Sequence, residues 1–97
     1  MNEVNQKYSW DPEKREQNIK ERGLDMVILA PKVLADPDLV IELDDRQDYG
    51  EERYLAYGIA DGLRLCFCFT PRNGLIHLIT IYKVREKIWR KHYGKNN

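Results

Sequence analysis

The fold of this chain is decided by residues 53–83, which read RYLAYGIADGLRLCFCFTPRNGLIHLITIYK. Two groups of turn-forming residues, Asp61-Gly62 and Pro71-Arg72-Asn73-Gly74, divide the stretch into three apolar runs. The pattern predicts three consecutive antiparallel strands, over residues 53–59, 64–70 and 75–83. The second and third runs are apolar on both faces, so we expect them to lie centrally in a sheet.

Shorter elements flank these strands. Residues 8–10 read as a short strand, and Asp11 as the N-cap of a helix that runs to Arg22, with Gly23 as its left-handed C-cap. A second helix over 26–35, interrupted by Pro31, and a strand over 39–43 follow. An amphipathic helix over 85–93, with Ile88 and Trp89 facing inward, precedes a frayed tail at 94–97.

These elements predict one α+β domain over residues 1–97, because helices segregated from an antiparallel sheet define that class. Its expected order is a short N-terminal strand, two helices, a four-stranded antiparallel meander and a C-terminal helix. The length of 97 residues and the hydrophobic fraction of 42% suit a single modest core.

Composition also favours a cytoplasmic protein. No apolar run approaches the roughly 20 residues needed to cross a bilayer, and residues 1–7 lack the apolar core of a signal peptide. Cys66 and Cys68 stand two residues apart on one expected strand, so they share a face and are poorly placed to form a disulfide. We interpret both as buried core thiols.

Charge is distributed unevenly although the net charge is zero. Residues 72–97 carry seven Lys and Arg against one acid, for +6, and residues 1–71 carry nine bases against fifteen acids, for −6. Residues 36–52 alone hold eight acids against Arg46, for −7. We expect a basic face that contacts polyanions and an acidic stretch that points away from nucleic acid; a solvated basic helix is the plainer alternative.

Several classes of chemistry find no support. The chain has two histidines, His77 and His92, without partners at metal-ligand spacing, and its Cys-x-Cys lacks a second pair. It has no glycine-rich phosphate loop, and its single serine, Ser9, argues against a serine triad. No metal and no cofactor are therefore expected.

Two signatures nevertheless carry a resemblance. The first is Trp10-Asp11-Pro12-x-Lys14-x-x-x-Asn18, and the second is Gly50-Glu51-Glu52-Arg53-Tyr54, just before a predicted strand. In this order, over roughly residues 8–93, the chain resembles the BrnT family of bacterial toxins. The resemblance implies a RelE-like fold and a ribonuclease held inactive by a ribbon-helix-helix antitoxin, BrnA-like, that binds operator DNA. It implies an RNA substrate, contact with DNA only through the antitoxin, and no membrane.

The chain departs from the family where the chemistry is expected. Relatives usually carry Lys-His-Gly where this chain has Glu21-Arg22-Gly23, and an arginine close to the position of Arg64. Two arginines of the family's last strand are replaced by His77 and Tyr82. Three readings stay open: an active ribonuclease, a catalytically decayed relative that serves as an antitoxin-binding co-repressor module, and an unrelated interaction domain.

Three residues are candidates for catalysis of a metal-free RNA cleavage. His77 can carry a proton near neutral pH, although a buried, hydrogen-bonded core histidine is the plainer reading. Tyr82 can donate a proton or stack on a base, or it is a core aromatic. Arg64 interrupts an apolar strand, so it either pairs with a carboxylate or lines a polar site. Simple alternation places His77 and Tyr82 on opposite faces unless a bulge intervenes.

Candidate contacts with RNA phosphates come from the basic side chains near the two helix ends. On the C-terminal side they are Lys83, Arg85, Arg90 and Lys91, and on the first helix they are Lys20 and Arg22. Glu51 and Arg53, which belong to the second signature, are expected to lock the turn through an ion pair.

Overall fold

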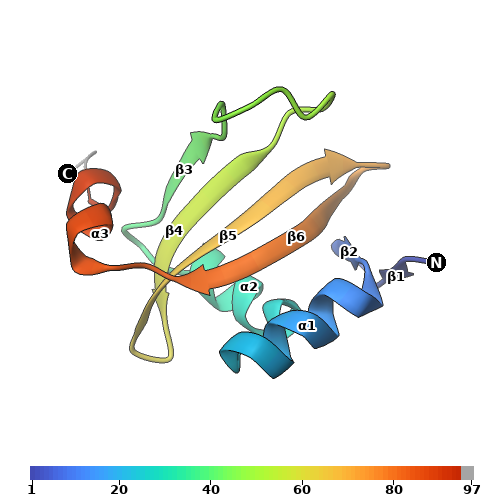
Figure 1. Cartoon of the computed structure of the whole chain (residues 1–97), viewed down its shortest axis with the longest axis horizontal. Coiled ribbons are helices and arrows are strands. Elements are labelled where there is room, and N and C mark those ends of the chain that lie inside the picture. Colours follow the sequence, from blue (N-terminus) through green and yellow to red (C-terminus); the bar gives the residue numbers. More distant parts are fainter. Residues whose placement is uncertain (95–97) are drawn as a thin grey trace.

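A six-stranded sheet in the order β1-β2-β6-β5-β4-β3 forms the centre of the molecule (Figure 1). The computed structural model describes residues 1–94. The helices are α1 (Pro12–Arg22), α2 (Met26–Leu34) and α3 (Glu86–His92). The strands are β1 (Glu3–Val4), β2 (Tyr8–Trp10), β3 (Val40–Leu43), β4 (Tyr54–Ala60), β5 (Leu63–Arg72) and β6 (Leu75–Lys83). The α+β class is confirmed, while residues 95–97 of the predicted tail lie outside the described part.

The two predicted hairpins form around two-residue turns. Asp61 and Gly62 have φ angles of 51° and 75°, and Asn73 and Gly74 have 54° and 74°. Positive φ at both central positions defines the type I′ turn, whose twist suits adjacent strands. Because the second turn needs only Asn73-Gly74, β5 runs on through Pro71 and Arg72, two residues further than predicted.

The pairing of the N-terminal segment differs from the predicted sheet. β2 pairs with β6 in parallel, Tyr8 opposite Ile76 and Trp10 opposite Leu78, and β1 adds an antiparallel edge that the sequence did not predict. The sheet is therefore mixed and contains more than the predicted meander. A three-residue strand carries no signal for the direction of its partner, so only the folded chain decides it.

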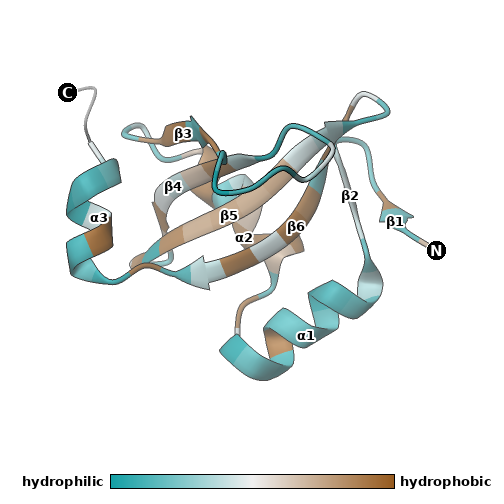
Figure 2. Ribbon diagram, turned by 45° about the horizontal axis from the view of Figure 1, so that its top comes forward, coloured by the Kyte–Doolittle hydropathy of each residue, from teal (hydrophilic) through white to brown (hydrophobic). Residues whose placement is uncertain are grey.

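One face of the sheet is covered by α1 and α2. Its core contains Met26, Ala30 and Val33 of α2 packed against strand residues such as Leu65, Phe67 and Ile81. Figure 2 shows the hydrophobic colour gathered on the central strands, while α1 is mostly hydrophilic. α2 continues through Pro31, which is exposed and does not divide the helix.

The opposite face, which we call the α3 face, carries a second core. It is formed by Val40, Leu55, Tyr57, Cys66, Cys68, Val84 and Trp89. Both cysteines are free and buried, as predicted, and burial raises the pKa of the Cys66 thiol to about 12. Trp89 faces inward, but Ile88 is 42% exposed, so its predicted inward orientation is wrong. Among the described residues, no helix is long and apolar enough to span a membrane.

Candidate functional site

A β-bulge in β6 brings two of the three predicted catalytic residues, His77 and Tyr82, to one face of the sheet. Thr80 pairs with Cys68 and Leu78 pairs with Phe69, so one residue of β6 between them has no partner on β5. His77 consequently lies opposite Thr70, and Tyr82 opposite Cys66, two β5 residues that regular alternation places on the same face. The expectation of opposite faces is wrong, because the bulge reverses the alternation.

His77 and Tyr82 nevertheless stand well apart along that face. Their partners on β5 are four residues apart, which corresponds to about 13 Å along a strand. One phosphodiester group cannot contact both side chains. The structure thus offers two separate places for chemistry on the α3 face.

His77 is a buried, hydrogen-bonded histidine. Its side chain is 6% exposed, and Nδ1 lies 2.8 Å from Oγ of Ser9 on the neighbouring β2. Burial lowers the pKa of His77, and the nearby charge of Arg72 lowers it further. The neutral imidazole is therefore favoured at this position.

Arg64 lies at the start of β5 on the same face as Cys66, by alternation. It is exposed, and it makes no side-chain hydrogen bond or ion pair with any residue in the described range. Of the two predicted alternatives, a carboxylate pair or a polar site, the carboxylate pair does not form among the described residues: Arg64 lies at the exposed end of the strand, where solvent hydrates the guanidinium. Arg64 remains free to meet an anion.

A cavity of about 450 Å³ opens on the α3 face. It is bounded by the end of β3 and the loop after it, by β4, by β6 and by α3. Its lining residues are Glu42, Leu43, Asp44, Asp45, Arg46, Leu55, Tyr57, Tyr82, Ile88 and His92. Tyr82 is thus the one sequence-predicted catalytic residue that lines this cavity. Burial raises the pKa of Tyr82, so its phenol stays protonated at neutral pH.

His92 and Glu42 form a pair in this cavity that the sequence did not reveal. Nδ1 of His92 lies 2.7 Å from Oε2 and 3.0 Å from Oε1 of Glu42. The imidazole also stacks on the ring of Tyr57, with centroids 4.7 Å apart and an interplanar angle of 1°. The pair joins α3 to β3 across 50 residues of sequence, and no local pattern predicts a contact at that separation.

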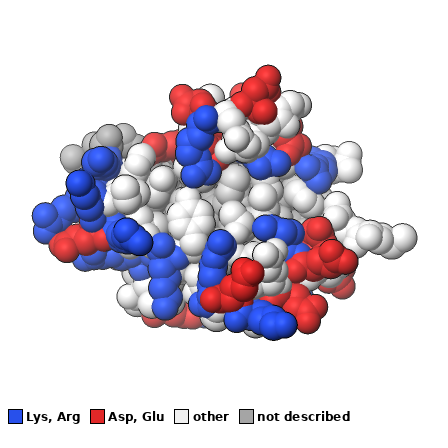
Figure 3. Space-filling view, viewed as in Figure 1, with Lys and Arg blue, Asp and Glu red and all other residues white. Residues whose placement is uncertain are grey.

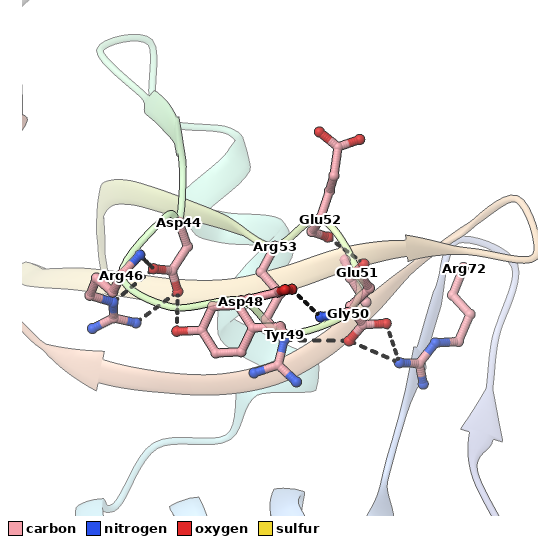
Figure 4. A network of polar contacts seen from close by, with 10 residues as sticks. Asp44, Arg46, Asp48, Tyr49, Gly50, Glu51, Glu52, Arg53 and Arg72 are labelled. Carbon is pink, nitrogen blue, oxygen red and sulfur yellow. Dashed lines mark hydrogen bonds and ion pairs between the residues drawn. The ribbon is translucent and has the colours of Figure 1, made fainter.

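The loop from Asp44 to Arg53 is held over the α3 face by ion pairs (Figure 4). Arg46 donates through Nε and Nη2 to the two oxygens of Asp44, at 2.7 and 2.8 Å, and Tyr49 donates to the same carboxylate. Glu51 accepts from Arg53 at 3.3 Å and from Arg72 at 3.0 Å. The predicted Glu51–Arg53 pair is confirmed, and Arg72 extends it to β5.

The position of this loop also differs from the expectation that the acidic stretch lies away from the candidate site. Glu42, Asp44 and Asp45, all within the acidic stretch, line the cavity together with Tyr82. Asp44 is 5% exposed, and its partner Arg46 holds the pKa of the carboxyl below its usual range. The acidic stretch therefore borders the candidate site, because residues 44–53 fold back over the sheet through these ion pairs.

The candidate phosphate contacts divide into two groups. Lys83, Arg85, Arg90 and Lys91 are exposed around α3, and Arg90 pairs with Glu86 at 2.7 Å. Figure 3 shows blue side chains gathered on the α3 side of the molecule and red ones at the top of the view. Lys20 is also exposed, but Arg22 donates to Asn18, to the hydroxyl of Thr80 and to the carbonyl of Ile81, which anchors α1 on β6.

Metal ligands do not gather in the described part of the chain: it contains no group of three or more His, Cys, Asp or Glu side chains that could hold a metal ion. The ionisable groups that line the cavity are three carboxylates, two phenols, one imidazole and one guanidinium, from Glu42, Asp44, Asp45, Tyr57, Tyr82, His92 and Arg46. These groups can transfer protons and stabilise an anion without a cofactor.

The fold and the site define a small α+β domain whose sheet carries proton-transfer groups and a basic border on one face. Comparison with known families gives the particular class: the model of the ribonuclease toxin BrnT of type II toxin–antitoxin systems matches residues 10–87. The chain belongs to this family, as the resemblance implied. Neither the curated proteins nor the solved structures contain a match.

Proposed function

We propose that this BrnT-family chain is a metal-independent endoribonuclease that cleaves RNA on the α3 face of its sheet. The observation that carries the proposal is the bulge in β6. It turns Tyr82 to the face that alternation along β5 assigns to Arg64 as well. A proton donor and a cation on one surface are two of the three groups that a metal-free cleavage requires, the third being a proton acceptor.

RNA would be held by the basic border of this face. Lys83, Arg85, Arg90 and Lys91 are exposed there and can each meet a phosphate. Lys20 is exposed on α1 and can add a contact, whereas the guanidinium of Arg22 is engaged with β6. Arg22 therefore contributes to RNA binding mainly by fixing α1 in place.

The proposed partner is a ribbon-helix-helix antitoxin, BrnA-like, that masks this face and binds operator DNA. The toxin would reach DNA only through that antitoxin and would act in the cytoplasm, where its RNA substrate is found. The support is membership of a toxin–antitoxin family together with a basic surface that an antitoxin must cover to block RNA.

Digestion of single-stranded RNA by the purified protein in excess chelator tests the mechanism. Full activity is expected, because no described cluster can hold an essential cation. Loss of cleavage in chelator, restored by magnesium, would contradict metal independence.

The second candidate function is a catalytically decayed relative that binds its antitoxin and acts as a co-repressor. The observation that favours it is Arg22, which stands where relatives carry histidine and serves a structural role here. A protein that binds antitoxin normally and cleaves no RNA under any condition would establish this alternative.

A further inference from the structure

The cavity beside α3 contains a more complete proton-transfer centre than the surroundings of His77. Resting on the proposed ribonuclease function, we propose that His92, oriented by Glu42, accepts the 2′-hydroxyl proton of RNA bound in this cavity, and that Tyr82 protonates the leaving oxygen. His92 and Tyr82 are then the catalytic residues, and Glu42 and Tyr57 are positioning residues.

The Glu42 contact fixes the orientation and the tautomer of the imidazole. Nδ1 is engaged by both carboxylate oxygens, at 2.7 and 3.0 Å. A carboxylate at one ring nitrogen holds the proton there and leaves the other, Nε2, as an acceptor. Nε2 makes no hydrogen bond to any described residue, so it is available to a substrate.

Packing restrains the imidazole further. The parallel ring of Tyr57 covers one face of the His92 imidazole at 4.7 Å. Tyr57 is itself 3% exposed and packs edge-on against Trp89, whose ring stacks on Tyr93. The hydroxyl of Tyr93 donates to Asp36 at 2.7 Å, which ties the end of α3 to the rest of the fold. His92 is therefore held on a fixed support.

Arg46 can supply the positive charge that the phosphate needs. Its Nε and Nη2 are bound to Asp44, while Nη1 has no hydrogen-bond partner among the described residues. The Arg46 side chain is 63% exposed and lines the cavity. The ion pair also neutralises Asp44, which would otherwise repel an RNA phosphate.

The reaction balances without an added reagent. The 2′-oxygen forms a bond to phosphorus as its proton moves to Nε2 of His92, and the bond from phosphorus to the 5′-oxygen breaks. Tyr82 gives its proton to that leaving oxygen, and solvent in the open cavity returns the proton from His92 to the phenolate. The products are a 2′,3′-cyclic phosphate and a free 5′-hydroxyl.

The test compares His92→Gln and Tyr82→Phe with His77→Gln, the competing candidate, and with the control Lys87→Gln on a single-stranded RNA. We expect His92→Gln and Tyr82→Phe each to reduce kcat by about 10²–10⁴-fold, the usual contribution of one acid or base. Lys87→Gln, which removes an exposed charge on the same helix, should leave kcat within a few fold of the parent value. Melting temperatures and near-ultraviolet circular dichroism confirm that each variant is folded.

A substrate with sulfur in place of the scissile 5′-oxygen separates the two roles, because a thiolate leaves without a proton. It should restore the rate of Tyr82→Phe but not that of His92→Gln. If this substrate restores the rate of His92→Gln, His92 is not the proton acceptor. If folded His92→Gln cleaves ordinary RNA at the parent rate, the assignment of His92 is likewise overturned.

Glu42→Gln tests the positioning role, since glutamine can still accept a hydrogen bond but carries no charge. We expect a lower kcat with an unchanged KM, because the imidazole loses its fixed orientation while the contacts to RNA remain. A Glu42→Gln variant with the kcat of the parent counts against the pair.

The same assays distinguish failure of this inference from failure of the proposed function. If the parent protein cleaves no RNA, the ribonuclease proposal itself fails. If the parent cleaves RNA in chelator while His77→Gln, and not His92→Gln, abolishes cleavage, the function stands and the proton acceptor lies at the other end of the face.

Discussion

The side-chain amide oxygen of Asn18 accepts the hydrogen bond from the backbone N–H of Ile81 that a neighbouring strand would otherwise accept. β2 pairs with β6 only as far as Leu78, so the backbone of Ile81 lies beyond the end of that partner. Asn18 Oδ1 accepts from the Ile81 N–H at 3.2 Å, and Arg22 donates to the Ile81 carbonyl at 2.9 Å. Helix α1 thereby supplies hydrogen-bond partners to the N–H and the carbonyl of Ile81, which would otherwise be left unpaired at the edge of β6.

Asn18→Leu should destabilise the fold. Asn18 is 2% exposed, and the change leaves the Ile81 N–H, the Thr80 hydroxyl and Arg22 without their common acceptor. We expect the free energy of unfolding in urea to fall by about 2–3 kcal/mol. Gln17→Leu, on the exposed side of α1, is the control and should change it by less than about 0.5 kcal/mol. Equal losses in the two variants would show that the contact contributes nothing specific.

Gly58→Ala should separate α2 from the sheet. A β-carbon at this position would lie 2.8 Å from the Val33 carbonyl oxygen and 2.9 Å from Val33 Cγ1. Because the closer atom belongs to the backbone, the helix must shift, at a cost of about 1–3 kcal/mol. Thermal melting of Gly58→Ala beside Ile59→Ala, its exposed neighbour, measures the difference. A melting temperature as high as that of the control variant would contradict the close packing.

The burial of His77 should make stability depend on pH. Burial lowers the folded-state pKa of His77 below its ordinary value of 6.5, so the unfolded chain binds the proton more readily. The stabilisation is complete above about pH 6.5 and is lost as the pH falls towards the folded-state pKa. The decrease in melting temperature between about pH 7.5 and 5.5 should be smaller in His77→Gln than in the parent. Lys20→Gln is the control, and an equal decrease in all three proteins would exclude His77 as the cause.

Arg64→Ala should impair cleavage far more than folding. The side chain is exposed and has no partner in residues 1–94, so its removal costs little stability. If it stabilises the charged transition state, kcat should fall by about 10²–10³-fold at an unchanged melting temperature. Lys87→Ala, which removes another exposed cation, should retain full activity. Unaltered cleavage by Arg64→Ala would exclude it from the site.

Reversal of the basic border should weaken RNA binding and its salt dependence. Glutamate at Lys83, Arg85, Arg90 and Lys91 removes phosphate contacts, so the slope of log K against log salt should become shallower. Lysine at the exposed acids Asp45 and Glu52 of the facing loop should leave binding intact or tighten it. Asp44 is unsuitable for this comparison because it is buried in its pair with Arg46. Fluorescence anisotropy with an uncleavable 2′-O-methyl RNA measures both sets, and the opposite pattern would refute the assignment of the RNA surface.

The sequence by itself determined the features that depend on neighbouring residues. Asp11 and Gly23 set the bounds of α1, and Asp61-Gly62 and Asn73-Gly74 set the two hairpins, because capping and positive φ are local requirements. Only the tertiary structure decided the parallel pairing of β2, the bulge that turned His77 and Tyr82 to one face, and the meeting of Glu42 with His92. These features depend on where distant segments come to lie when the two cores pack, and no local preference of the chain encodes that arrangement.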